Sequence, residues 1–239
     1  MSVEVIVALI SAVVALASAI ISVYAQFGLA RYQTKKQAEA TLAKYREPLI
    51  YAAHELQSRF YNIHQQRFLQ KYYLSNDDLE KEYALESTLY VIAQYFSWTE
   101  ILRRDVQFLN LGDVEATRNL AQQQERIGVL FHSDAPHLGS LWRLFRAEQR
   151  AIGECMITSQ GDTAACRGYA SFVEDKSENL RRWFVRLGQD VDAMARPPAE
   201  SVRLVQVQHA LVDLIDFLDP DHMRFSKGKR EKIPASDYD

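Results

Sequence analysis

Cysteine, glycine and proline are all scarce in this chain, and each scarcity excludes a class of structure. The two cysteines, Cys155 and Cys166, are too few for a disulfide framework and lack zinc-binding spacing, so we expect reduced structural thiols. Only 9 glycines and 6 prolines interrupt 239 residues rich in helix formers such as Ala, Leu, Glu, Gln and Arg. Strand-like alternation and internal repeats are also missing. The sequence therefore predicts an all-α protein.

An excess of charge of either sign is lacking as well. Lys and Arg together number 28 and Asp and Glu 31, a balance that argues against a nucleic-acid partner. The sequence contains neither a nucleotide-binding glycine loop nor a Gly-x-Ser-x-Gly nucleophile turn, so we identify no catalytic residue and no cofactor. This composition favours a non-enzymatic role over an enzyme.

Metal-binding patterns are equally sparse. A di-iron bundle would need Glu-x-x-His pairs on facing helices, and the sequence has none. His209, Asp213 and Asp216 lie close together on one expected helix, but on the side opposite its apolar residues, as in an ordinary solvated face. We therefore expect no metal site.

The sequence has one long hydrophobic run, from Val5 to Ala30, without a single charged side chain. A helix needs roughly 20 apolar residues to cross the hydrocarbon core of a bilayer, so residues 1–30 are predicted to form a transmembrane anchor that contacts lipid through residues 5–30. A cleaved signal peptide is the alternative, because Ala17-Ser18-Ala19 resembles a cleavage site. The acidic Glu4 and the continuation of the run to Phe27 favour an uncleaved signal-anchor.

The charges that flank the run predict its orientation. Arg31, Lys35 and Lys36 follow it directly, and basic residues next to a membrane span face the cytoplasm. Residues 31–47 are therefore expected to form a basic juxtamembrane stalk helix on the cytoplasmic side of a single-pass protein. Its N-terminus would lie outside, and a bacterial inner membrane and a plasma membrane fit equally well.

Small residues recur along one side of the predicted anchor at spacings of three and four. Such a stripe lets two helices approach closely in lipid, which predicts a homo-oligomer. The alternative is that alanine and serine are common in any anchor and form a stripe by chance. The stripe consists of Ser11, Ala15, Ser18, Ser22 and Ala25.

Residues 48–219 are predicted to form a cytoplasmic up-down bundle of about six helices, because their helix-length segments are joined by short connections. The stalk should bend or end near Glu47, since proline disfavours helical geometry in the preceding residue. Residues 220–239 lose hydrophobic periodicity and are expected to be a polar, flexible tail. The expected helices of the bundle are 48–74, 78–109, 113–131, 138–158, 168–195 and 200–218, and a break near Asp175 is an alternative to one continuous helix over 168–195.

One pair of charged residues is expected to lie inside the bundle. If residues 138–158 form one helix, Glu148 falls in the middle of its apolar face, where a lone carboxylate would be costly. Arg103 falls on the apolar stripe of the helix over 78–109 and is the expected partner. The pair either fixes the packing of the two helices or forms part of a polar pocket.

These observations predict a membrane-anchored cytoplasmic scaffold, adaptor or regulatory module that presents helix faces to an unknown protein partner. The alternative is a membrane-tethered enzyme or small-molecule sensor with its pocket around Glu148 and Arg103. A pore of oligomerised anchors is a third possibility, and it is disfavoured because residues 5–30 carry no charged side chain, whereas polar functions within a membrane usually use ionisable residues.

Overall fold

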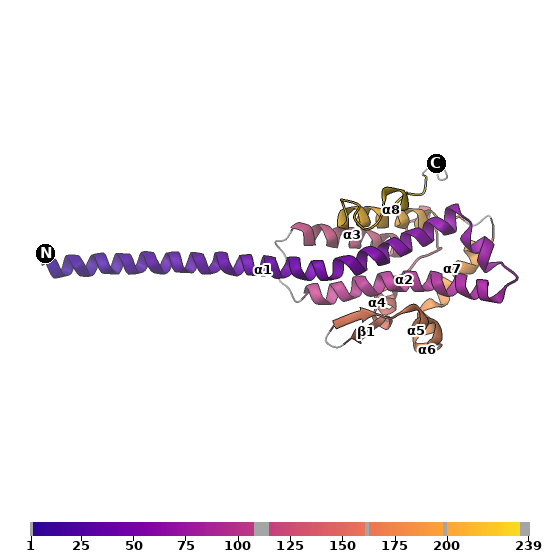
Figure 1. The fold of residues 1–239 in the computed structure, drawn as a ribbon, viewed down its shortest axis with the longest axis horizontal. Coiled ribbons are helices and arrows are strands. Elements are labelled where there is room, and N and C mark those ends of the chain that lie inside the picture. The colour runs from indigo at the N-terminus through magenta and orange to yellow at the C-terminus, as the bar shows by residue number, and fades with distance from the viewer. Residues whose placement is uncertain (1, 108–114, 161–162, 198–199, 235–239) are drawn as a thin grey trace.

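The computed structural model describes residues 2–107, 115–160, 163–197 and 200–234. One long helix, α1 (Val3–Gln65), projects from a helical bundle into which its C-terminal part is built (Figure 1). Apart from a single two-stranded hairpin, the regular elements of the described residues are helices. The predicted all-α class with an apolar N-terminal helix is therefore confirmed.

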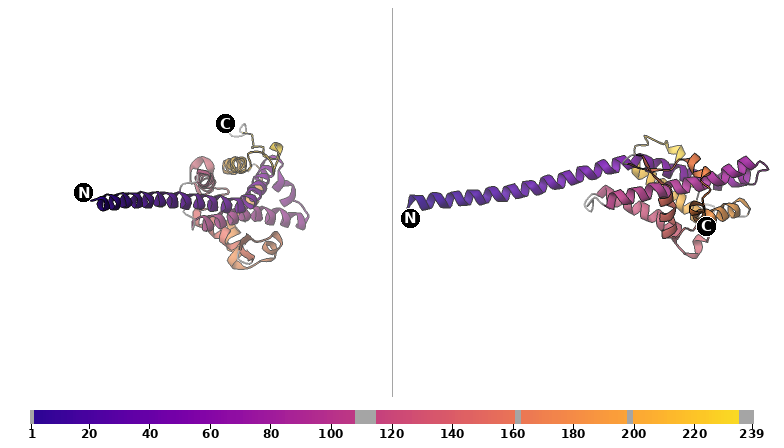
Figure 2. Two further views of the ribbon diagram at one scale, coloured as in Figure 1. Left: turned by 60° about the vertical axis from the view of Figure 1, so that its left-hand side comes forward. Right: turned by 90° about the horizontal axis from the view of Figure 1, so that it is seen from below.

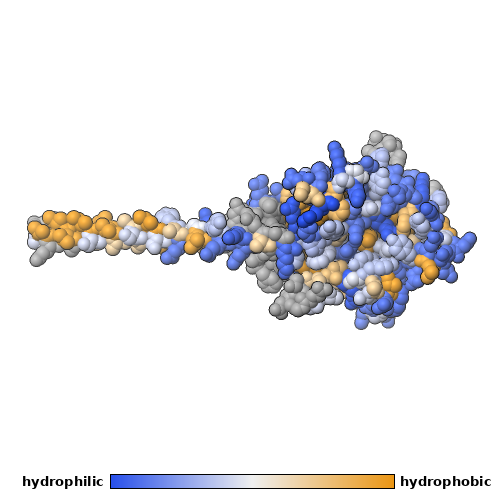
Figure 3. All heavy atoms as spheres, in the orientation of Figure 1, coloured by the Kyte–Doolittle hydropathy of each residue, from blue (hydrophilic) through white to orange (hydrophobic). Residues whose placement is uncertain are grey.

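The helix α1 changes its surroundings along its length. Ile10–Thr34 is long and apolar enough to cross a membrane, and none of it is buried in the protein. Figure 3 shows this part as a rod with an orange, hydrophobic surface, in contrast to the mostly blue bundle. From Tyr45 onward the helix contributes buried side chains to the core, including Leu49, Leu56 and Phe60.

Pro48 lies inside α1 and does not end it. The sequence predicted a bend or an end near Glu47. The helix is continuous, and its ribbon changes direction as it runs into the bundle (Figures 1 and 2). A proline removes one backbone donor and bends a helix, and here packing of the flanking turns keeps the two halves together.

Three further long helices complete the bundle around α1. They are α2 (Asp78–Gln107), α3 (Glu115–His132) and α8 (Val202–Leu218). The helix α1 packs against α8 and α2, and α3 covers α8 (Figure 1). A cluster of aromatic rings joins α1, α2 and α3: Phe131 of α3 lies 5.1 Å from Phe96 of α2 and 6.4 Å from Phe60 of α1, measured between ring centroids. Residues 108, 109, 113 and 114, where one expected helix ends and the next begins, lie outside the described residues.

Shorter elements fill the rest of the chain. The helix expected over 138–158 is much shorter, because only α4 (Arg146–Cys155) is α-helical and a β-hairpin follows it. No strand was predicted there from the sequence. The helical region 168–195 is interrupted at Asp175, as expected. The remaining elements are η1 (Leu69–Tyr73), η2 (Pro136–Leu138), β1 (Ile157–Gln160), β2 (Thr163–Cys166), α5 (Tyr169–Glu174), α6 (Glu178–Arg181), η3 (Arg182–Phe184), α7 (Val185–Ala195) and η4 (Lys227–Lys229).

Arg203, on α8, is completely buried and holds the end of α3 in place. Its guanidinium donates hydrogen bonds to the carbonyls of Phe131 at 3.1 Å and Ser133 at 2.8 Å. Further bonds reach Gly139 at 2.9 Å and Leu141 at 3.1 Å in the segment between η2 and α4. The last carbonyls of a helix lack internal partners and carry partial negative charge, so the buried cation is matched by backbone dipoles.

The C-terminal segment packs against the bundle, contrary to the flexible tail expected from its composition. Arg230 and Ile233 are buried, and Arg230 pairs with the Asp219 carboxylate at the end of α8. Gln208 of α8 donates to the Glu231 carbonyl at 2.8 Å and accepts from the Ile233 amide at 3.1 Å. Side-chain bonds to the backbone have no sequence period, which explains why periodicity missed this contact. Residues 235–239 lie outside the described residues.

Asp190, on α7, is a buried carboxylate with few partners. It is 8% exposed and accepts a hydrogen bond from the Trp142 amide at 3.1 Å. Burial raises the pKa of Asp190 to about 6, although the hydrogen bond from Trp142 and the charges of Arg186 and Arg203 oppose the rise. The folded protein therefore binds the Asp190 proton more tightly than the unfolded chain does, and this favours folding at low pH.

We predict that Asp190→Asn makes the protein more stable at pH 8 and has little effect near pH 4. The stabilising contribution of a raised carboxyl pKa is complete below the unfolded value of 3.8 and is lost as pH rises through about 6. The asparagine amide is uncharged at every pH and can still accept from the Trp142 amide. The free energy of unfolding at pH 8 should therefore rise by at most about 3 kcal/mol, the equivalent of a pKa raised from 3.8 to about 6. Urea unfolding of the full-length protein in detergent measures it.

Asp192→Asn, two residues away, is the matched control because Asp192 is only half-buried and pairs with Arg196. It should give no gain at pH 8. An equal gain from both variants, or a loss from Asp190→Asn at pH 8, would contradict the assignment of a destabilising buried charge.

Candidate functional site

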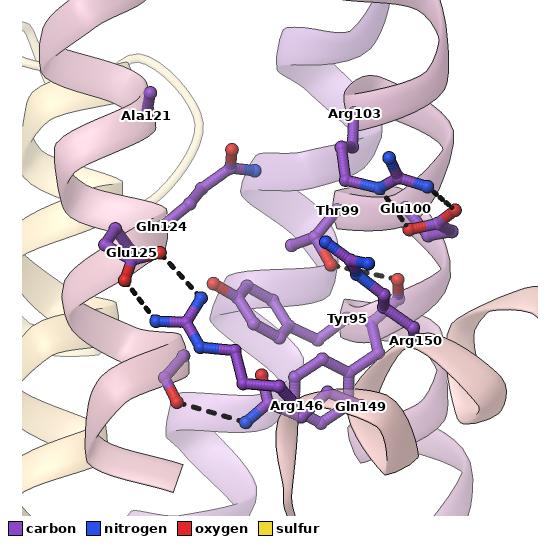
Figure 4. Close-up of a pocket in the computed structure, with 12 residues that line it drawn as sticks. Tyr95, Thr99, Glu100, Arg103, Ala121, Gln124, Glu125, Arg146, Gln149 and Arg150 are labelled. Carbon is purple, nitrogen blue, oxygen red and sulfur yellow. Dashed lines mark hydrogen bonds and ion pairs between the residues drawn. The ribbon is translucent and has the colours of Figure 1, made fainter. Parts of the chain in front are cut away.

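A polar pocket of about 250 Å³ lies between α2, α3 and α4 (Figure 4). The sequence predicted a polar pocket around Glu148 and Arg103, and of these two residues only Arg103 lines this pocket. The helices that meet there supply both aromatic and charged side chains. The lining consists of Tyr95, Phe96, Thr99, Glu100 and Arg103 from α2, Ala121, Gln124, Glu125 and Gly128 from α3, and Arg146, Gln149 and Arg150 from α4.

Two glycines allow the walls of the pocket to come together. Gly153 of α4 lies so close to α2 that an added Cβ would stand 2.5 Å from the Phe96 carbonyl oxygen. A Cβ at Gly128 of α3 would stand 3.3 Å from Gln149 Oε1. Gln149 in turn ties α4 to α3, because its amide nitrogen donates to the Gly128 carbonyl at 3.0 Å. The pocket is thus bounded by helices held in close contact.

Both carboxylates of the pocket are neutralised by arginine. Glu100 accepts two hydrogen bonds from Arg103, at 2.7 and 2.6 Å, and one from Arg104 at 2.8 Å. Burial alone would raise the pKa of Glu100, but these hydrogen bonds outweigh burial and hold it below the usual value. On the opposite wall, Glu125 is engaged bidentately by Arg146, whose hydrogen bond holds the pKa of Glu125 below its usual range.

Three hydrogen-bond donors at the pocket have no partner in the described part of the chain. The hydroxyl of Tyr95 is buried without a hydrogen bond, and so is the Gln124 amide nitrogen. Burial raises the pKa of Tyr95, so its hydroxyl stays protonated and remains a donor. Arg150 is exposed and forms no ion pair with another described residue. In the view of Figure 4 the Tyr95 hydroxyl lies between the guanidinium groups of Arg146 and Arg150.

Glu148 does not take the position that the sequence predicted for it. The helix α4 begins at Arg146, eight residues later than expected, so Glu148 lies in its first turn and not in its middle. Its carboxylate accepts from the Phe145 amide at 2.8 Å and lies 3.8 Å from Arg186. Arg103 binds Glu100 instead. An acidic side chain that reaches back to the first amide is a helix-capping arrangement, and Glu148 is not among the residues that line the pocket.

Other candidates from the sequence have structural partners. His209 contacts the Ile233 carbonyl at 2.7 Å, Asp213 pairs with Arg126 and Lys232, and Asp216 pairs with Arg230. The Arg126 pair ties α8 to α3, and the other contacts hold the C-terminal segment. In the part of the chain that the structure describes, no group of three His, Cys, Asp or Glu side chains is arranged to hold a metal ion. Cys155 and Cys166 are free thiols, and burial raises the pKa of both.

No family model, curated protein or solved structure matches this chain. The choice of site therefore rests on its geometry. A larger hollow of about 480 Å³ lies between α1 and α2 and includes Arg59 and Tyr83. There, the Arg59 guanidinium lies over the Phe68 ring at 4.1 Å. Unpartnered polar atoms line both sites, since Arg59 Nη1 and His54 Nε2 also lack partners in the described part of the chain. The pocket between α2, α3 and α4 is the stronger candidate because Tyr95 is completely buried, whereas Arg59 and His54 are only half-buried.

Sequence reasoning found Arg103 and missed the rest of this constellation. Tyr95 is buried on α2, and nothing in the sequence around it indicates that its hydroxyl lacks a partner. Glu125, Arg146 and Arg150 resemble ordinary surface charges in sequence. They come together only because α4 packs closely on α2 and α3. The helix expected over 138–158 begins at the wrong residue, so it could not show which side of α4 faces these helices.

We predict that Tyr95→Phe leaves the free energy of unfolding unchanged or raises it by up to about 1 kcal/mol. Removing a buried hydroxyl that makes no hydrogen bond removes a desolvation cost and leaves no new unpaired group. Urea unfolding of the full-length protein, without added ligand, measures the change.

Tyr90→Phe is the control, because the Tyr90 hydroxyl donates to the Arg167 carbonyl at 3.2 Å. It should lose about 1 kcal/mol. If Tyr95→Phe destabilised the protein as much as Tyr90→Phe, the Tyr95 hydroxyl would have a partner of its own and would not be a free donor.

Proposed function

We propose that the protein is a single-pass membrane protein whose first helix holds a helical bundle in the cytoplasm as a scaffold, adaptor or regulatory module. The observation that carries this proposal is the continuity of α1 from its exposed apolar half into the core. Water disfavours so much exposed apolar surface, and lipid would cover it. The basic residues from Arg31 onward favour the cytoplasm for the bundle.

A partner surface is the second requirement of a scaffold. Exposed apolar side chains are scattered singly over most of the bundle, which is ordinary for a protein surface. Three of them, Leu74, Leu79 and Tyr83, lie at or near the turn that joins η1 to α2. This turn is the end of the bundle farthest from the N-terminus of α1 (Figure 1). We propose this end as the surface offered to a protein partner.

We further propose that the anchors associate into a homo-oligomer through the predicted stripe. Ser11, Ala15, Ser18, Ser22 and Ala25 all lie on the exposed part of α1. The Ser18 hydroxyl donates to the Val14 carbonyl at 2.8 Å within the same helix, so it adds no unpaired donor to a lipid-facing surface. Small residues there leave room for a second helix.

The second candidate function is a membrane-tethered sensor, and the polar pocket favours it. Its unpartnered donors suit a bound molecule, and neither histidine nor cysteine is among the described residues that line it. That lining supports binding more than catalysis, so the enzyme reading of the same site is the weaker one. The two candidates are compatible, since ligand binding in the pocket can regulate a scaffold.

We predict that the full-length protein with green fluorescent protein fused to its C-terminus stays in bacterial membranes after a carbonate wash and fluoresces. Fluorescence is expected because this reporter matures in the cytoplasm and fails when it is exported unfolded. Native mass spectrometry of the untagged protein released from detergent should give the intact 27.5 kDa chain in a defined oligomer.

Replacing Arg31, Lys35 and Lys36 together by glutamate is the control, because it removes the charge asymmetry that sets orientation and should lower the fluorescence per molecule. A mature chain that begins near residue 20 and lies outside the cytoplasm would overturn the anchor. An intact but monomeric chain would overturn the proposed oligomer and leave the anchor standing.

A further inference from the structure

We propose that the pocket between α2, α3 and α4 binds one oxyanion group, a carboxylate or a phosphate, of a small soluble molecule. This inference names the ligand class of the sensor function proposed above, and it does not depend on the membrane placement of the protein. The oxyanion chemistry rests on the charge, the unpartnered donors and the volume of the pocket, and the distance from the membrane enters only in the choice between a soluble anion and a lipid headgroup.

The charge of the lining favours an anion. Three guanidinium groups and two carboxylates line the pocket, which leaves one positive charge in excess. Glu100 and Glu125 are each held bidentately, by Arg103 and Arg146, so neither carboxylate is free to repel an anion at full strength. The excess charge resides on Arg150, which has no recorded partner among the described residues. A single oxyanion would balance it.

The unpartnered groups are donors, which is the chemistry that an oxyanion needs. The Arg150 guanidinium offers the fork that matches carboxylate and phosphate oxygens. The Tyr95 hydroxyl and the Gln124 amide nitrogen are buried without partners, and both donate. A buried donor without a partner destabilises the folded protein. An acceptor that bound these donors would remove that free-energy cost, and the recovered free energy would add to its affinity. Neutral or cationic molecules would leave the Arg150 charge unmatched.

The volume limits the size of the ligand. A pocket of about 250 Å³ has space for roughly eight water molecules at about 30 Å³ each. This is smaller than the usual site for a drug-sized molecule, which exceeds about 300 Å³. We therefore assign the pocket to an inorganic anion or a small metabolite bearing the oxyanion group, and not to a nucleotide or a peptide.

The distance from the membrane favours a soluble source for the anion over a lipid headgroup. Between Thr34, at the end of the apolar segment, and Tyr45, the first buried side chain of the bundle, α1 rises by about 16 Å at 1.5 Å per residue. The headgroup region extends only about 5 to 8 Å beyond the hydrocarbon. The helix α4, which supplies three lining residues, packs against the C-terminal half of α2, where its Gly153 meets Phe96 and Glu100 (Figure 1).

The test is thermal unfolding of the full-length protein in neutral detergent, with about 10 mM inorganic phosphate, acetate or chloride at one fixed ionic strength. Phosphate or acetate should raise the unfolding midpoint by about 3 °C or more over chloride, because a ligand that binds only the folded state stabilises it. The response to each of the two probes also tells which oxyanion the site prefers.

Two variants make the result specific. Arg150→Gln should abolish the shift, and Tyr95→Phe should reduce it. Arg182→Gln is the matched control, because Arg182 is an exposed arginine that lies over the Trp183 ring and does not line the pocket. It should keep the full shift. The absence of any shift with both oxyanions, or an equal loss in Arg150→Gln and Arg182→Gln, would overturn the proposal.

A final experiment decides between a soluble anion and a lipid headgroup as the ligand. In nanodiscs of phosphatidylcholine and in nanodiscs with about a third phosphatidylglycerol, the phosphate or acetate shift should be the same. If the anionic lipid removed the shift in the native protein, its headgroup would occupy Arg150 and the soluble ligand would be wrong. Membrane topology plays no part in any of these readings, so a failed anchor and a failed anion site give different results.

Discussion

Along α1, one helix meets two different surroundings, and the arrangement of the bundle follows from this constraint. From Ile10 to Thr34 its side chains are apolar and exposed, whereas from Tyr45 to Ile63 the same helix provides core residues that pack against α8 and α2. A loop between these parts would let the bundle move freely. A continuous helix fixes the distance and direction of the bundle relative to the exposed segment, and Pro48 changes that direction without breaking the chain of helical turns.

Within the bundle, arginines close the ends of helices. Arg203 gathers carbonyls at the end of α3, and Arg181 donates to the carbonyls of Phe172 and Val173 at the end of α5 while pairing with Glu86 of α2. Arg46 of α1 and Arg230 of the C-terminal segment meet at the end of α8. Helix C-termini present unpaired carbonyls and negative dipole charge, which supply acceptors for these cations. Arg181 and Arg230 also pair with carboxylates, whereas Arg203 is held by carbonyls. Arginines also pair with the two carboxylates of the pocket, and Arg150 is the lining arginine that has no ion pair among the described residues.

Patterns with a period could be predicted from the sequence, and contacts without one could not. The apolar run, the all-α class and the break at Asp175 follow from composition and spacing. The position of Glu148 was wrong because a continuous helix was assumed from residue 138, while the chain first forms a short turn in which Trp142 has a positive φ of 62°. The β-hairpin after α4 has only four residues in each strand, too few for an alternation to be visible. Arg103 was found, but its partner was Glu100, three residues away on its own helix.

The continuity of α1 is the central claim, and a distance across Pro48 tests it most directly. Nitroxide labels at positions 37 and 65, both exposed on α1, are 28 residues apart, with Cys155 and Cys166 replaced by serine. For one helix with a modest bend, double electron–electron resonance should give a single narrow distribution of label-to-label distances, centred at about 40 Å. A broad distribution, or a main distance below about 30 Å, would mean a flexible break at Pro48 and would contradict the account.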